Sequence, residues 1–266
     1  MATPREINRH MKSVGNIGKI TKAMKMVAAA RLRRAQEKAA ASRPYAIKIK
    51  EVLSNVVSDP SVLAGLDAKK HPLLQKREVQ KVGYLVLCSD KGLAGAYSSN
   101  ALKKAIAEIS ECEDEVVIIT CGRKARDFFT RRGFNVIQSH IGFSDRPTYE
   151  NAVAIAQDAI KTFASEGFDK LNIVYTIFKT ALSQIPTSEV ILPVEPPAKE
   201  NDKAQASFMF EPGEDETLKV LAPKYLETVV YAALVQSAAS ELGSRMTAMS
   251  SATDNAAKLV SSLQLS

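Results

Sequence analysis

The stretch best suited to chemistry is the glycine-bearing segment of residues 89–97, SDKGLAGAY, which follows a short apolar run. A glycine-containing turn between a strand and a helix is where α/β proteins often bind phosphate, because backbone N–H groups and the helix N-terminus face the anion. The segment matches neither G-x-G-x-x-G nor G-x-x-x-x-G-K-[ST], and neither motif occurs elsewhere in the chain. We therefore expect no nucleotide or other cofactor here, and predict a turn that packs a helix on a sheet or serves as a docking surface.

The other reactive residue types show no catalytic pattern. His10, His71 and His140 lie far apart and lack metal-ligand spacing, and no G-x-S-x-G elbow is present. The cysteines are too few and too irregularly spaced for a disulfide framework or a zinc site, and are Cys88, Cys112 and Cys121. These absences favour a chain that is neither an enzyme nor a metal-binding protein, with a small phosphate-binding enzyme kept as an alternative.

Positive charge is concentrated at the N-terminal end of the chain. The net charge is +7, yet residues 1–50 alone carry +11 and the remainder carries −4. A basic helix of this kind can follow the phosphates of a nucleic acid or face an acidic protein partner. The residues alone leave three functions open: a rod that docks on proteins, a coiled coil that binds nucleic acid, and a small phosphate-binding enzyme.

Two long helices are predicted at the ends of the chain, and together they predict an antiparallel coiled coil. The first spans residues 4–58, with a stripe of apolar residues at steps of three and four: Ile7, Met11, Val14, Ile17, Ile20, Met24 and Val27. The last helix has a similar seam: Ala232, Val235, Ala239, Leu242, Met246, Met249, Thr253, Ala256, Val260 and Leu263. It has few charges and many Ala and Ser residues, which predicts a slim surface that fits inside another structure.

Between these helices the apolar pattern alternates between short buried strands and amphipathic helices. Strands are predicted at residues 81–88, 115–121, 134–138, 170–179 and 185–194, and helices at 98–109, 123–132 and 148–164. Such alternation indicates a mostly parallel, doubly wound sheet. The predicted fold class is therefore α/β, a long antiparallel coiled coil plus a small Rossmann-like α/β domain, with parts at 1–58, 59–213 and 214–266.

Three longer blocks of sequence carry a resemblance to a known family. They are residues 15–35 (GNIGKITKAMKMVAAARLRRA), 89–100 (SDKGLAGAYSSN) and 240–256 (SELGSRMTAMSSATDNA). Over essentially its whole length the chain resembles the gamma subunits of F-type ATP synthases, in their bacterial form. Members of that family continue beyond the position of Ser266.

The resemblance implies a non-catalytic rotor in the central stalk of a proton-translocating ATP synthase. The partners it implies are three alpha and three beta subunits around the coiled coil, an epsilon subunit and a membrane ring of c subunits. It implies no nucleic acid partner, no insertion into the membrane, and a peripheral position on the cytoplasmic face of the plasma membrane. Carried over by motif, Met24, Lys25, Arg245 and Met246 would face the lower loops of the beta subunits, and Phe210 and Glu211 would lie near the c ring.

Overall fold

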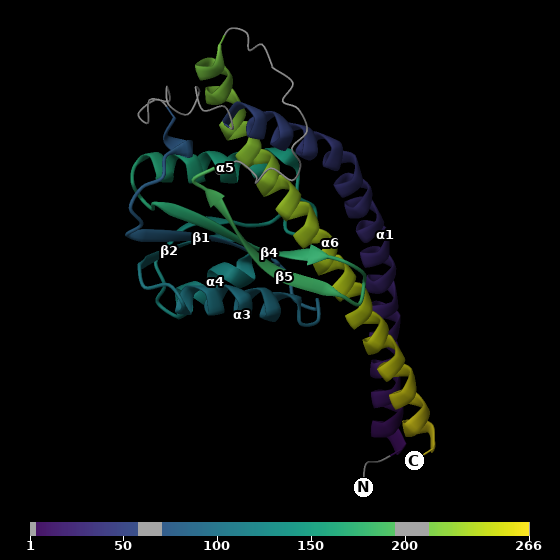
Figure 1. Ribbon diagram of the computed structural model, residues 1–266. Helices are drawn as coiled ribbons and strands as arrows, with labels where there is room; N and C mark the ends of the chain where they lie inside the picture. Colours follow the sequence, from purple (N-terminus) through teal and green to yellow (C-terminus); the bar gives the residue numbers. More distant parts are fainter. Residues whose placement is uncertain (1–3, 58–70, 195–212, 266) are drawn as a thin grey trace.

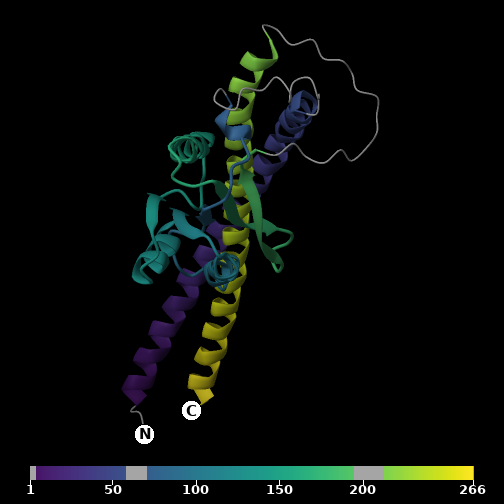
Figure 2. The same cartoon turned by 60° about the vertical axis from the view of Figure 1, so that its left-hand side comes forward.

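A computed structural model describes residues 4–57, 71–194 and 213–265 of the chain (Figure 1). Helix α1 (Pro4–Val57) and helix α6 (Glu214–Leu265) form a long pair, and an α/β domain lies against the pair (Figures 1 and 2). The strands are β1 (Lys81–Leu87), β2 (Glu115–Cys121), β3 (Val136–His140), β4 (Lys170–Phe178) and β5 (Gln184–Leu192). The helices between them are η1 (Pro72–Leu74), α3 (Tyr97–Ser110), α4 (Arg123–Arg131) and α5 (Tyr149–Ala164). The predicted α/β fold class is confirmed.

The two long helices run antiparallel, as predicted. The Thr21 and Thr253 hydroxyl oxygens lie 2.7 Å apart, and Lys25 Nζ donates to Ser250 Oγ at 3.0 Å. Residue numbers therefore rise along α1 as they fall along α6, and both chain ends lie at the same end of the pair (Figure 2). Among the described residues, no helix has the combination of length and apolarity that a membrane span requires.

The face that α1 turns towards α6 differs from the predicted apolar stripe. Ile17, Ile20 and Val27 are 51%, 59% and 52% exposed, so these three assignments were wrong. A Cβ added to Gly18 would lie 3.4 Å from Cβ of Ala256, and Thr21 is buried beside Thr253. At Gly18 and Thr21 the helices approach so closely that small residues fill the contact, whereas Val14 and Leu32 are buried as larger apolar residues and Ile17, Ile20 and Val27 lie on a neighbouring face.

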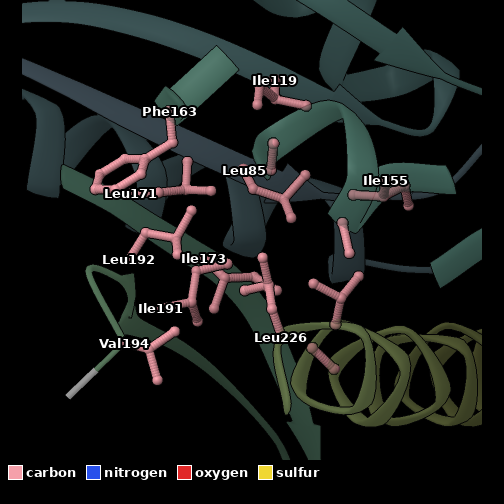
Figure 3. Packing of buried hydrophobic residues seen from close by; sticks show 14 of the residues in the cluster. Leu85, Ile119, Ile155, Phe163, Leu171, Ile173, Ile191, Leu192, Val194 and Leu226 are labelled. Carbon is pink, nitrogen blue, oxygen red and sulfur yellow. The ribbon is translucent and has the colours of Figure 1, made fainter. Parts of the chain in front are cut away.

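The sheet has the strand order β3-β2-β1-β4-β5, with β5 antiparallel to β4 and the other pairings parallel. Helices α3 and α4 cover one face, and α5 and α6 cover the other (Figure 1). Leu226 of α6 belongs to the same buried cluster as Leu85 of β1 and Ile173 of β4 (Figure 3). The last helix is thus part of the core of the α/β domain as well as half of the coiled coil.

Two of the three cysteines are buried between the strands and the helices, and we expect them to be chemically inert. Cys88 directly follows β1, and its N–H donates to the carbonyl of Cys121 at 2.8 Å. Burial raises the pKa of Cys88 to about 11 and raises the pKa of Cys121 as well. Because the thiolate is the reactive form, iodoacetamide at about pH 8 should modify only the half-buried Cys112 of the folded chain.

Mass spectrometry of the alkylated chain tests this expectation. The same treatment in denaturant should label all three thiols, which controls for the reagent. Alkylation of Cys88 or Cys121 in the folded chain at the rate of Cys112 would contradict it.

Candidate functional site

Helix α6 lies across the carboxyl ends of β1 and β4 (Figure 1). The parallel ladder between these strands ends at Val86 and Val174. Beyond it, Thr176 N–H donates to Ser237 Oγ at 3.2 Å, and Thr176 O accepts from Ser240 Oγ at 3.0 Å. The serines of α6 therefore replace β1 as the hydrogen-bonding partner of β4 at this end.

This contact corrects the expectation of a slim helix surface left free for another structure. Ser237, Ser240 and Ser244 are buried against this chain's own sheet and hairpin, and Ser244 Oγ donates to Gln184 Oε1 at 2.9 Å. A Cβ added to Gly243 would lie 2.9 Å from Cε2 of Phe178, so the β4–β5 hairpin also approaches α6 closely. Small residues in this part of α6 serve contacts within the chain.

The loop of residues 89–96 packs on α6 from the other side. Arg245 Nη2 donates to the carbonyl of Gly92 at 3.3 Å, and a Cβ on Gly95 would lie 3.7 Å from the carbonyl oxygen of Ser244. In doubly wound sheets the crevice outside the carboxyl ends of the strands, where the strand order reverses, is the usual ligand site. Here that crevice, between β1 and β4, is occupied by a helix of the same chain, and the glycine-bearing loop packs against that helix, a partner that the sequence did not predict.

A buried ion pair lies where α6 contacts the 89–96 loop. Glu241 is 1% exposed, and its Oε1 accepts from Arg245 Nη2 at 2.7 Å. Burial raises the pKa of Glu241, and the attraction of Arg245 opposes that rise only in part. The pair is therefore a costly arrangement that depends on both partners being present.

A second set of charges ties α1 to the same region. Arg31 of α1 pairs with Asp145, and Lys91 Nζ of the 89–96 loop lies 3.5 Å from the same carboxylate. The α/β domain is thus held to α1 by the ion pair at Asp145 and to α6 by the hydrogen bond from Arg245 to Gly92.

Asp90 joins the 89–96 loop to two further segments. Its carboxylate accepts N–H groups from Arg123 at 3.1 Å, Gly142 at 2.9 Å and Ser144 at 3.0 Å. Burial alone would raise the pKa of Asp90, but these backbone donors stabilise the charged form and the pKa is lowered overall. The loop is therefore fixed to the start of α4 and to residues 142–144.

The residues expected to contact partner subunits lie in different environments. Lys25 is exposed, Met24 is half-buried, and Met246 is half-buried against the cluster around Leu32. Arg245 is only 8% exposed and is held within the chain. Phe210 and Glu211 lie outside the described residues.

The sequence did not identify Glu241 as part of the contact between α6 and the α/β domain. Glu241 and Arg245 have the same spacing as Asp254 and Lys258 further along α6, with the acid four residues before the base. The two pairs differ in burial in the structure, because Glu241 and Arg245 are buried whereas Asp254 and Lys258 are both exposed. Only the crossing of α6 over the strand ends distinguishes the buried pair.

Comparison with known proteins covers the whole chain. A family model described as ATP synthase matches residues 3–266. An ATP synthase gamma chain from Brevibacillus brevis is 46% identical over 265 residues, covering 98% of this chain and 90% of that protein. Another from Desulfitobacterium hafniense is 42% identical over 265 residues, covering 100% of this chain and 91% of the relative.

Solved structures share the fold at lower sequence identity. A chain from the central stalk and c-ring of the Tetrahymena thermophila mitochondrial ATP synthase superposes with a TM-score of 0.64 at 23% identity, covering 88% of this chain and 99% of that one. A rotor chain of the Euglena gracilis mitochondrial enzyme gives a TM-score of 0.62 at 16% identity, covering 98% and 94%. On the full-length match to the family model and the bacterial relatives, this chain belongs to the ATP synthase gamma chain family.

Proposed function

We propose that this chain is the rotor of a proton-translocating F-type ATP synthase, a non-catalytic subunit of the central stalk. Its helix pair would stand inside a ring of three alpha and three beta subunits. Its other end would join an epsilon subunit and the membrane c ring, on the cytoplasmic face of the bacterial plasma membrane. The observation that carries the proposal is an antiparallel helix pair projecting beyond an attached α/β domain, in a chain 46% identical to a gamma chain (Figure 2).

Exposed aliphatic residues on the projecting part of the helix pair support the proposal that other subunits enclose it. We call the helix pair the shaft. Ile17, Ile20 and Val27 are each more than half exposed, and they recur at helical spacing on α1. A stripe of large apolar side chains on one helix face favours a protein partner over water. A surrounding ring of subunits would cover this stripe.

The coupling mechanism we propose is differential contact. The two helices present different residues, with the excess positive charge on α1, so the shaft offers a different surface in each direction. As it turns, each beta subunit would meet a different surface and favour a different conformation of its catalytic site, which is coupling between sites through contact energy. Individual exposed charge contacts should be weak, of about 1 kcal/mol or less, so that no single angle traps the rotor.

Within this function we propose that Met24, Lys25 and Met246 contact the lower loops of the beta subunits. Arg245 lies in the same part of the helix pair but is buried. We therefore propose that it affects the contacts with the beta subunits through its neighbours in this chain. Phe210 and Glu211 remain proposed contacts to the c ring.

Reconstitution tests the function as a whole. Alpha, beta and epsilon subunits combined with this chain and bound to c-ring-containing membranes should pump protons when ATP is added, and the same mixture without the chain should not. Release of the chain with nucleic acid, together with proton pumping that does not depend on it, would favour the nucleic-acid-binding alternative instead.

Lys25→Glu is expected to lower ATP-driven proton pumping several-fold without lowering the melting temperature of the chain. Lys25 is exposed, so reversal of its charge changes what a partner meets, leaves the core intact and costs the chain only the surface hydrogen bond to Ser250. Lys103→Glu, on the exposed surface of α3, provides the control with the same chemistry. Equal pumping by the Lys25 and Lys103 variants would exclude the proposed contact.

A further inference from the structure

The Glu241–Arg245 pair is an unusual way to fill a helix-to-sheet contact. Taking two charges out of water costs free energy, and apolar residues of similar size commonly replace such pairs with no loss of stability. The pair fixes the orientation of the Arg245 side chain, because a guanidinium that is hydrogen-bonded to a carboxylate can donate its other N–H groups only in fixed directions. Here Nη2 of Arg245 donates both to Glu241 Oε1 at 2.7 Å and to the carbonyl of Gly92 at 3.3 Å.

The loop that receives this hydrogen bond needs to be held in place. Leu93, the next residue, has φ +64° although it is not glycine, and its side chain is 63% exposed. A leucine in the left-handed region is strained, and this conformation persists only where its surroundings fix the backbone. The contact from Arg245 acts on the peptide group directly before this strained residue.

The same loop is tied to the rest of the α/β domain at its other end. Ser89 and Ser98 hydroxyl oxygens lie 2.6 Å apart, and Asp90 accepts the N–H groups of Arg123, Gly142 and Ser144. The loop is therefore continuous with the domain on one side and touches the shaft through Arg245 on the other. A force on the domain would reach α6 in part through this hydrogen bond.

We propose that Glu241 is a positioning residue whose carboxylate fixes Arg245, and that Arg245 fastens the 89–96 loop to α6 so that shaft and α/β domain turn as one body. This inference rests on the proposed rotor function. The apolar residues of α6 in the domain core and the serines that bind β4 already attach the domain to this helix, and Arg245 adds an attachment to the loop on the other side of the crevice. Attachment on both sides of the crevice restrains twisting of the domain about the helix more than attachment on one side does.

Hydrogen exchange on the full chain tests the attachment. In Glu241→Gln the charge is lost while the size is kept, and exchange of the amides of residues 90–96 should accelerate by about tenfold or more. Amides of β2 should be unchanged. Asp254→Asn, the exposed acid with the same spacing on the same helix, should leave both regions unchanged. Unchanged exchange in residues 90–96, or equal acceleration throughout the chain, would overturn the proposal.

A double variant separates positioning from stability. Glu241→Leu with Arg245→Met removes both buried charges, so the melting temperature should return close to that of the original chain. If the pair positions the loop, amide exchange in residues 90–96 of the double variant should be as fast as in Glu241→Gln. The reconstituted assembly with the double variant should also pump fewer protons per ATP than the assembly with the original chain. Recovery of slow exchange and full pumping in the double variant would show that the pair serves stability alone.

The original chain distinguishes this inference from the function on which it rests. If the assembly containing the unmodified chain fails to pump protons, the rotor function is wrong whatever the exchange data show. If that assembly pumps and Glu241→Gln pumps equally well per ATP, the rotor function stands and the positioning role is wrong.

Discussion

Arg245→Met is expected to lower the free energy of unfolding by about 3–5 kcal/mol at neutral pH, because it leaves the carboxylate of Glu241 buried without its partner. Glu241 is 1% exposed and cannot turn to water without moving α6 off the strand ends. Urea unfolding of the full chain measures the change. Lys258→Met removes an exposed base with the same spacing on the same helix, and should change the free energy by less than about 0.5 kcal/mol.

The loss in Arg245→Met should depend on pH in a defined direction. Burial already raises the pKa of Glu241 beside Arg245, and without the cation it rises further. A carboxyl group with a raised pKa in the folded chain favours folding below its unfolded pKa, and this contribution disappears as pH rises through the folded pKa. The difference between the variant and the original chain should therefore shrink from pH 7 to about pH 4.5, near the pKa of an unfolded glutamate. A difference that grows on acidification would show that Glu241 is not the group left unpaired.

Gly122→Ala is expected to destabilise the chain by more than about 3 kcal/mol. Gly122 follows β2 with φ +99°, a conformation that side chains rarely allow. An added Cβ would also lie 2.8 Å from the carbonyl carbon of Cys88 and 3.0 Å from that of Ser89, both of them backbone atoms. Backbone atoms of a buried strand end cannot move aside as a flexible side chain would, so α4 or the 89–96 loop must shift.

Gly142→Ala separates the two causes of that loss. Gly142 has φ +98°, but a Cβ there meets nothing within 4 Å. The substitution should therefore cost only the backbone strain, about 1–3 kcal/mol. Equal losses at the two positions, read from urea unfolding, would mean that the close approach of Cys88 to Gly122 contributes nothing.

The fold could be predicted from the sequence wherever the spacing of apolar residues indicated a helix or a buried strand. The two terminal helices and the alternating strands of the domain are of this kind. The contact face of α1 could not be predicted in the same way, because Gly18 and Thr21 occupy it through small size and hydrogen bonding. Hydrophobicity selected Ile17 and Ile20 instead, which the structure leaves exposed.

The candidate site was harder to predict than the fold. The 89–97 segment could be recognised as a packing turn because it lacks a phosphate-binding motif, but nothing local shows that its partner is a helix more than a hundred residues later. The four-residue spacing of Glu241 and Arg245 allows a pair on one helix face, but the burial of that pair depends on where α6 crosses the sheet. The contacts proposed for Met24, Lys25 and Met246 concern other chains and stay predictions.

The place of α6 in the domain core has a consequence for synthesis of the protein. Leu226 and Val230 complete the buried cluster, and Ser237 and Ser240 complete the hydrogen bonding of β4, yet all four belong to the final helix of 52 residues. While the ribosome is still making that helix, the nascent chain carries a sheet with one face covered by α5 alone and a strand end unpaired. We therefore expect the domain to finish folding only after this part of α6 has emerged from the ribosome, and its exposed strands need protection until then.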